Sequence, residues 1–204
     1  MGDPRKNASE FMSETLSRAI EGMSAADAES RVAAATEIHH VGRAFADHAI
    51  FPWWSDKELS TLLGGGNPFV TIGLAVSPER FQKIREASGL PRLAEVPPDQ
   101  DAQEFELHLP GGISLDVLTS RDPQGNGAIA RYLQKFGEGI QQIELRCQNV
   151  DRATSILRER FGLSAVYPTT RPGADGTRIN FFLVSAPKAN KVLIELYEPA
   201  PHID

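Results

Sequence analysis

This sequence has only one cysteine, no long apolar run and no N-terminal segment typical of a leader. The single Cys147 excludes an intrachain disulfide, and we expect a buried, unreactive thiol because no histidine base is paired with it. No apolar run approaches the roughly 20 residues that cross a bilayer. The N-terminus has no apolar segment typical of a secretory signal. These absences predict a cytoplasmic protein.

An excess of basic residues is also missing. The formal net charge is −6, whereas partners such as nucleic acid and anionic lipid usually require a basic patch. Hydrophobic residues make up 41% and charged residues 24% of the chain, as in ordinary globular domains. We therefore expect a small-molecule substrate or ligand, and neither nucleic acid nor membrane as a partner.

The first third of the chain has a helical pattern. Apolar residues recur at helical spacing between residues 9 and 63, interrupted by Phe51-Pro52-Trp53-Trp54. We expect the two tryptophans to dock these helices on the rest of the protein. The run Gly64-Gly65-Gly66-Asn67-Pro68 can continue neither helix nor strand, so residues 1–66 are predicted to form a helical extension.

After residue 66 the pattern occurs twice. Each copy predicts a strand, a helix and three further strands, and the two helices end alike in Ser88-Gly89-Leu90 and Phe161-Gly162-Leu163. A linking helix is predicted over 128–136. The modules are predicted at 67–122 and 123–204, the second including the linker. The predicted elements are 69–76, 78–88, 91–96, 104–109 and 113–118, then 140–147, 151–161, 165–167, 178–184 and 192–197.

Three segments carry a family resemblance: AIARYLQKFGEGIQQIEL, RPGADGTRINFFLV and KVLIELYEP. Over roughly residues 69–199, the chain resembles the vicinal-oxygen-chelate superfamily, and within it the methylmalonyl-CoA epimerases. The resemblance implies an α+β fold in which two βαβββ modules form a curled mixed sheet around a cavity. It also implies a possible homodimer.

The resemblance further implies a metal site that this chain has altered. Glu195 and Asp116 match two ligand positions, but the family's two histidines are Thr71 and Gln142 here. Imidazole suits Co, Ni and Zn, whereas an all-oxygen set suits Mg, Ca or Mn, usually weakly. This change argues against a divalent metal cofactor. If a metal is bound, Asp116, Gln142 and Glu195 are the expected ligands.

The predicted chemistry is acid/base catalysis by carboxylates. Glu104 matches an acid/base glutamate of the family, with Glu106 as an alternative register, and we expect Glu104 and Glu195 to act as the acid/base pair. Strand alternation places Glu104, Glu106 and His108 on one face, either toward the cavity or toward solvent. The expected substrate-binding residues are Thr71, Asp116, Gln142, Glu106 and His108. The sequence thus predicts an isomerase or lyase acting on a small carbonyl or acyl compound, with an acyl-CoA as one candidate.

Three alternatives stay open. In the first alternative, the chain is a metal-free binding protein, like the drug-sequestering branch of the same superfamily. In the second, the cavity is vestigial and the N-terminal helices make the chain an interaction module. The third concerns His39-His40-Val41-Gly42, which resembles the family's first-strand histidine motif. The expected helix and strands follow Val76 better than they follow this motif, so we interpret its histidines as surface or packing residues. In the other interpretation, these histidines extend from the N-terminal helices into the cavity.

Overall fold

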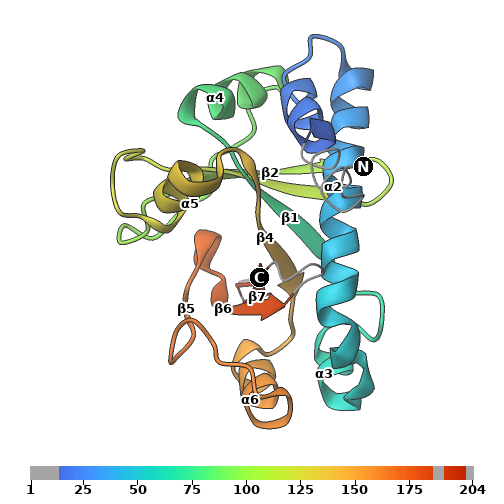
Figure 1. Ribbon diagram of the computed structural model, residues 1–204. Helices are drawn as coiled ribbons and strands as arrows, with labels where there is room; N and C mark the ends of the chain where they lie inside the picture. Colours follow the sequence, from blue (N-terminus) through green and yellow to red (C-terminus); the bar gives the residue numbers. More distant parts are fainter. Residues whose placement is uncertain (1–13, 186–190, 201–204) are drawn as a thin grey trace, which may run out of the picture.

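The computed structural model describes residues 14–185 and 191–200. Within these ranges the chain forms one seven-stranded mixed sheet with helices packed on it (Figure 1). The predicted α+β fold, with two related modules in one curled sheet preceded by helices, is confirmed. No helix in the described ranges is long and apolar enough to cross a membrane.

The two modules repeat one order of elements. The first module contains β1 (Val70–Ala75), α4 (Pro78–Ala87), β2 (Gln103–Leu109) and β3 (Ile113–Thr119). The second contains β4 (Gly139–Arg146), α6 (Val150–Phe161), β5 (Arg171–Pro172), the short 3-10 helix η2 (Ala174–Gly176), β6 (Arg178–Ser185) and β7 (Lys191–Glu198). The linking helix is α5 (Ala128–Phe136), as predicted.

The strand that follows the helix differs from the prediction in both modules. Residues 91–96 form no strand, and one backbone hydrogen bond, from Ala94 N to Glu104 O (3.0 Å), ties them to β2. Residues 165–167 are reduced to an isolated bridge between Ala165 and Phe182. Prolines at 91, 97, 98 and 168 remove the backbone donors that a longer ladder needs. These segments instead become loops beside the sheet.

The sheet has the strand order β2-β3-β1-β4-β7-β6-β5. Inside each module the first strand runs parallel to the last, as β1 with β3 and β4 with β7. The modules meet where β1 pairs antiparallel with β4. Both modules therefore contribute to the same two faces of one sheet.

Strand alternation separates an apolar face from a polar one. The apolar face is buried under α4, α6 and the N-terminal helices, and its residues include Ile72, Leu115, Phe105, Ile143, Ile194 and Phe182. The residues between them point to the opposite, concave face, which carries most of the buried polar side chains of the sheet. This face holds the candidate site described below.

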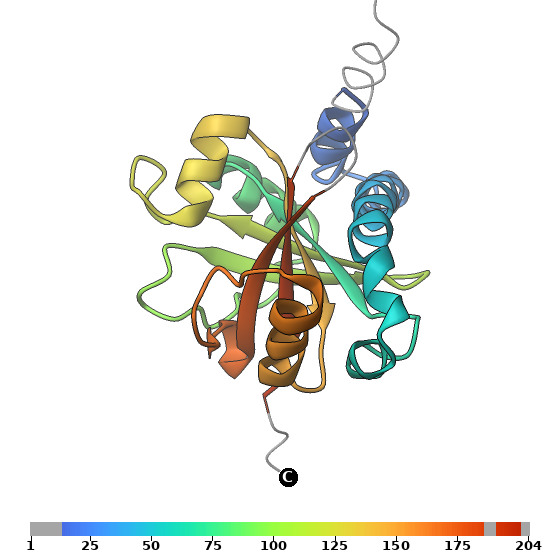
Figure 2. The ribbon, with the colours of Figure 1, turned by 60° about the horizontal axis from the view of Figure 1, so that its bottom comes forward.

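The N-terminal helices cover the apolar face across the junction of the modules. A helical segment at residues 14–22 precedes α2 (Ala28–Ile50), whose stripe of Ala35, Ile38 and Val41 is buried. Helix α2 contacts β1, β3, β4 and β7, so it touches strands of both modules (Figure 2). The 3-10 helix η1 (Phe51–Ser55) follows, and its Trp53 is only 2% exposed, as a docking residue should be.

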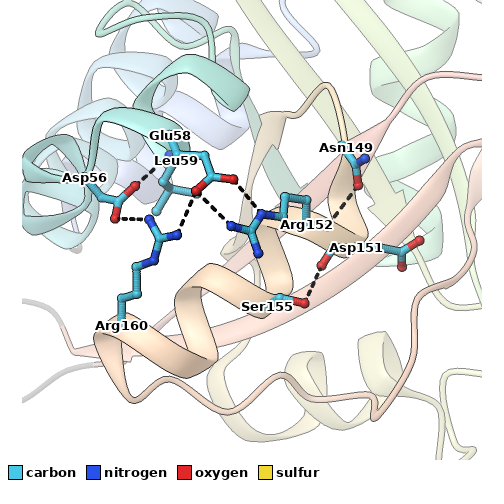
Figure 3. A network of polar contacts seen from close by, with 8 residues as sticks. All are labelled: Asp56, Glu58, Leu59, Asn149, Asp151, Arg152, Ser155 and Arg160. Carbon is cyan, nitrogen blue, oxygen red and sulfur yellow. Dashed lines mark hydrogen bonds and ion pairs between the residues drawn. The ribbon is translucent and has the colours of Figure 1, made fainter.

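Helix α3 (Lys57–Leu62) is fastened to the second module by ion pairs, which we call the α3–α6 clamp (Figure 3). Glu58 accepts from Arg152 Nε (2.6 Å) and Nη2 (2.9 Å) and from Arg160 Nη2 (2.7 Å). Asp56 caps α3 through Leu59 N (3.0 Å) and accepts from Arg160 Nη1 (2.7 Å). The bidentate geometry fixes the direction of α3 on α6.

Helix α2 approaches the sheet closely at Gly42, and this contact generates a testable prediction. A Cβ at position 42 would lie 2.6 Å from Cδ1 and 2.7 Å from Cγ2 of Ile72. We expect Gly42→Ala to destabilise the protein by about 1–3 kcal/mol through overpacking, although alanine is the better helix former. Urea unfolding measures the change.

The matched control is Ala44→Gly, two residues along on the exposed side of α2. It should cost about 1 kcal/mol through helix propensity alone. A stabilised Gly42→Ala variant would show that α2 does not pack this closely on β1.

Candidate active site

A cavity of about 770 Å³ lies on the concave face of the sheet. Both modules line it, with side chains from β2, β3, β4, β6 and β7. Helix α5 closes one end through Ala128 and Ile129, and loops near residues 91–102 and 166–177 form the rim. A pocket of this size can enclose a small organic ligand.

Two rows of cross-strand neighbours bring the cavity floor together. In the first row, Glu106 on β2 pairs with Asp116 on β3, which neighbours Gly73 on β1, and Gly73 pairs with Gln142 on β4. In the second row, Glu144 on β4 neighbours Glu195 on β7. Glu104 lies on β2 two residues before Glu106 and also lines the cavity. Five carboxyl groups therefore share one concave surface.

Gln142 is the donor at the centre of this surface. Its amide nitrogen donates to Glu195 Oε2 (2.8 Å) and to Glu144 Oε1 (3.1 Å). The close approach depends on Gly73, because a Cβ there would lie 2.4 Å from Gln142 Cγ. One amide thus holds two carboxyl groups of the second module beside each other.

The electrostatics of the floor favour protonated carboxyl groups. Burial, then the charges of Glu144 and Asp175, raises the pKa of Glu104 to about 8. Burial raises the pKa of Glu144 to about 7, although its hydrogen bond from Gln142 opposes the shift. These two groups titrate near neutral pH, where general acids and bases work best.

Asp116 is buried on β3, and Glu195 is half-buried on β7. Burial and then the charges of Glu104 and Glu144 raise the pKa of Asp116 well above its ordinary value. Burial and then the charges of Glu144 and Glu104 raise the pKa of Glu195. Carboxyls from the two modules therefore act on each other across the cavity, as close like charges do.

Glu144 is the residue that sequence reasoning missed. It lies two positions after Gln142 on one strand, so strand alternation points both side chains to the same face. An acidic residue inside the otherwise apolar run Ile143-Glu144-Leu145 was the available signal. The structure gives it a more central place than Thr71 or His108.

Of the predicted site residues, Glu104, Glu106, Asp116, Gln142 and Glu195 line the cavity, whereas Thr71 and His108 lie outside its lining. Thr71 donates to Ser114 Oγ (3.1 Å), and Ser114 contacts His108 Nδ1 (3.1 Å). His108 Nε2 lies 2.8 Å from Glu106 Oε2. These residues form a polar chain along the same face, beside the cavity.

Ion pairs fasten the rim loops of the two modules to each other. Arg92 donates to both carboxylate oxygens of Asp175, at 3.0 and 2.6 Å, and Asp175 also accepts from Glu95 N (2.9 Å). Arg171 pairs with Asp99 and stacks over the Tyr167 ring at 4.6 Å. Two of the cavity's arginines are thus engaged by carboxylates of the rim.

The floor residues do not fit a divalent metal ion. The amide nitrogen of Gln142 faces Glu195 and Glu144, so this side chain presents donors to the carboxylates rather than a lone pair to a cation. In the part of the chain that the structure describes, no group of three or more histidine, cysteine, aspartate or glutamate side chains is placed to hold a metal.

The remaining candidates lie away from the cavity. His39 is half-buried on α2 and His40 is exposed there, and neither lines the cavity, in agreement with a packing or surface role. Burial lowers the pKa of His39. Cys147 is buried, and burial raises the pKa of its thiol to about 11, which agrees with the expected unreactive thiol.

Comparisons with known proteins place the chain among solved structures. No family model matches the chain, and no curated protein matches it. A hypothetical protein from Bacillus halodurans is similar, with 25% identity and a TM-score of 0.52 over 66% of this chain and 95% of that chain. Methylmalonyl-CoA epimerase from Streptomyces coelicolor, in complex with 2-nitronate-propionyl-CoA, has 25% identity and a TM-score of 0.50 over 64% and 95%.

Methylmalonyl-CoA epimerase from Mycobacterium tuberculosis is 34% identical, with a TM-score of 0.53. The match covers 64% of this chain and 87% of that chain. At this identity over most of the relative's length, the chain belongs to the methylmalonyl-CoA epimerase family of the vicinal-oxygen-chelate superfamily.

Proposed function

We propose that the protein is an isomerase of the epimerase type that moves a proton at the carbon next to the carbonyl of an acyl-CoA thioester. Solved relatives are described in complex with 2-nitronate-propionyl-CoA and with methylmalonyl-CoA. The family assignment supports an acyl-CoA substrate, and the concave cavity supplies the carboxyl groups that the chemistry needs.

The observation that carries this proposal is the position of Glu104 and Glu195 on opposite walls of one cavity. Glu104 belongs to β2 of the first module and Glu195 to β7 of the second. Burial, and after it the charges of Glu144 and Glu104, raises the pKa of Glu195, which supports a pair of carboxyls that face one ligand. Two carboxyls on opposite sides of a carbon can remove a proton from one face and return it to the other.

Burial, and after it the charges of neighbouring carboxyls, disfavours ionisation of both groups. The proposed mechanism requires that one of Glu104 and Glu195 holds a proton while the other is ionised. The ionised group removes the proton from the substrate carbon, and the protonated group donates to the opposite face. Each turnover exchanges the two states.

The charge that develops on the thioester oxygen requires a donor. We assign this role to the protonated carboxyl of Glu144, whose pKa is about 7, because a neutral carboxylic acid in a buried site can donate to an enolate oxygen. The sequence resemblance implies Thr71 and Gln142 at the family's histidine ligand positions, and we therefore assign the chemistry to the carboxyls themselves. Gln142 positions Glu195 and Glu144 through its amide.

Hydrogen exchange at the substrate carbon tests this function. We expect the protein to catalyse incorporation of deuterium from D2O into acyl-CoA thioesters, followed by NMR across a panel that includes methylmalonyl-CoA and propionyl-CoA. Glu104→Gln and Glu195→Gln should each slow exchange by about 10²–10⁴-fold, since each removes an acid/base group.

Glu86→Gln on the exposed side of α4 is the matched control and should leave exchange unchanged. Thioester binding without any exchange would contradict the isomerase and favour the metal-free binding protein. Equal exchange rates in the wild type and in both active-site variants would rule out this acid/base pair.

The raised pKa values also predict how stability depends on pH. The folded protein keeps the Glu104 proton up to about pH 8, whereas the unfolded chain releases it near the ordinary glutamate pKa of 4.5. The protonated Glu104 therefore contributes its full stabilisation of the fold below about pH 4.5. This contribution decreases as the pH rises and is lost through about pH 8. The free energy of unfolding should fall over this window.

Urea unfolding between about pH 5.5 and about pH 8.5, roughly 1.5 pH units on each side of neutrality, measures the effect. Glu104→Gln should flatten the decline and be more stable than the wild type at the alkaline end, by at least about 1 kcal/mol. Glu86→Gln should show the wild-type decline. An unchanged slope in Glu104→Gln would mean that this carboxyl titrates normally.

A further inference from the structure

A β-bulge on β4 turns a second glutamine into the cavity. In the ladder between β1 and β4, Gln142 and Ile140 pair with consecutive residues of β1, so Gln141 between them is an extra residue. Regular alternation would direct Gln141 and Gln142 to opposite faces of the sheet. Both line the cavity instead, because a bulge re-aims the side chain at its position. Gln141 is thus a cavity residue that strand periodicity does not predict.

Helix α5 holds the bulge in place. The hydroxyl of Tyr132 donates to Ile140 O (2.9 Å), directly before Gln141 in the chain. Gly139 permits this approach, because a Cβ at its position would lie 3.0 Å from Tyr132 Oη. The bulged segment is therefore fastened to the linking helix, which closes this end of the cavity.

The amide of Gln141 is not engaged by the rest of the protein. Gln141 is half-buried and has no hydrogen-bond partner among the described residues, whereas Gln142 is bound to two carboxyl groups. The Gln141 oxygen is enclosed, so it is not the atom that meets a ligand. Its amide nitrogen is not among the enclosed polar atoms that lack a partner, and this nitrogen is a hydrogen-bond donor. Gln141 therefore offers a ligand a donor without charge.

The wall beside this amide is apolar. Its lining includes the packed side chains of Ala102, Leu118 and Ile129. β4 borders this cluster, because Gly139, two residues before Gln141, pairs with Ala75 of the same cluster. An apolar wall with one neutral donor suits a ligand group that is mainly apolar and has one uncharged oxygen.

A negatively charged ligand group fits this end less well. Asp101 lines the cavity at the start of α5, where its Oδ2 would lie 2.6 Å from a Cβ at Gly127. This carboxylate accepts from Ser120 Oγ and from Asp122 N (3.0 Å), and no cation pairs with it among the described residues. Arg131 on α5 also lines the cavity, but it is exposed to solvent. A ligand carboxylate would therefore be repelled by Asp101 and gain little from Arg131.

We propose that Gln141 binds an uncharged oxygen, of a keto or hydroxyl group, on the part of the ligand that lies at the α5 end of the cavity. Both groups present an acceptor oxygen to the amide nitrogen. The substrate class rests on the proposed function: it is an oxoacyl or hydroxyacyl thioester rather than a thioester with a second carboxylate. Gln141 then determines specificity, while Glu104 and Glu195 move the proton.

Two matched ligand series test this proposal, with binding measured by NMR titration and EDTA present so that no metal mediates it. The first series needs no thioester: benzylacetone, its secondary alcohol, hydrocinnamate and butylbenzene carry a ketone, a hydroxyl, a carboxylate and no oxygen on similar frames. The second series places the same groups on the acyl chain of acetoacetyl-CoA, β-hydroxybutyryl-CoA, malonyl-CoA and butyryl-CoA.

In each series we expect the ketone, the alcohol or both to bind about three- to tenfold tighter than the compound without the oxygen, as one neutral hydrogen bond allows. The carboxylate should bind no tighter than that reference compound. The tighter of the ketone and the alcohol identifies the substrate.

Gln141→Leu should reduce this preference to near unity, because leucine has a similar volume and no donor. The compound without the oxygen should keep its affinity within about twofold. Gln141→Met repeats the test with an unbranched side chain if leucine disturbs β4. Gln82→Leu removes an amide from the exposed side of α4 and should retain the full preference.

The outcomes separate this inference from the proposed function. Selection of the ketone or the alcohol in the first series, with no binding of any thioester, would support the Gln141 site and overturn the acyl-CoA function. Deuterium exchange into butyryl-CoA without selection in either series would support the acyl-CoA function and overturn the Gln141 site. Tightest binding of the carboxylate, absence of binding in both series, or a preference that survives in both Gln141 variants would overturn that site as well.

Discussion

β1 and β4 pair antiparallel from Val70 and Leu145 to Ala75 and Gly139, and through this pairing the two modules share one sheet. Without it, the carboxyls of β2 and β3 would have no counterpart on the other wall, because Glu144 and Glu195 belong to the second module. The pairing also brings Gly73 beside Gln142, where the absent side chain leaves room for the amide. The geometry of the site therefore follows from one strand junction.

The apolar face of the same strands offsets the cost of the polar one. Burial of charged groups is unfavourable unless they are paired or neutralised, and the concave face holds several such carboxyls. The opposite face carries Ile72, Ile143 and Ile194 under helices, which supplies the hydrophobic burial that a strained site requires. One face of the sheet thus stabilises the fold through apolar packing, while the other carries buried carboxyls that lower its stability, as is common at functional sites.

Strand periodicity and repetition made much of the fold predictable from the sequence. The linking helix over 128–136 follows from the pattern, whereas the family resemblance implied the site positions of Asp116, Gln142 and Glu195, which line the cavity. Strand alternation does not determine how far along the concave face the cavity extends. Thr71 was therefore predicted to bind substrate, whereas it lies beside the cavity and donates to Ser114. The segment 91–96 has strand-like residues, but its flanking prolines limit pairing to one backbone hydrogen bond. Glu144 was recoverable by counting two positions from Gln142.

Helix α2 contacts strands of both modules on the outer face, and the α3–α6 clamp fastens the next helix to the second module. These helices therefore stabilise the junction of the modules on its outer face. Bending the sheet at the junction would expose buried apolar side chains of α2, which is unfavourable. Separating Arg92 from Asp175 at the rim breaks a solvent-exposed ion pair and costs less free energy. A ligand would therefore pass more easily between the rim loops than by separation of the walls that carry the carboxyls.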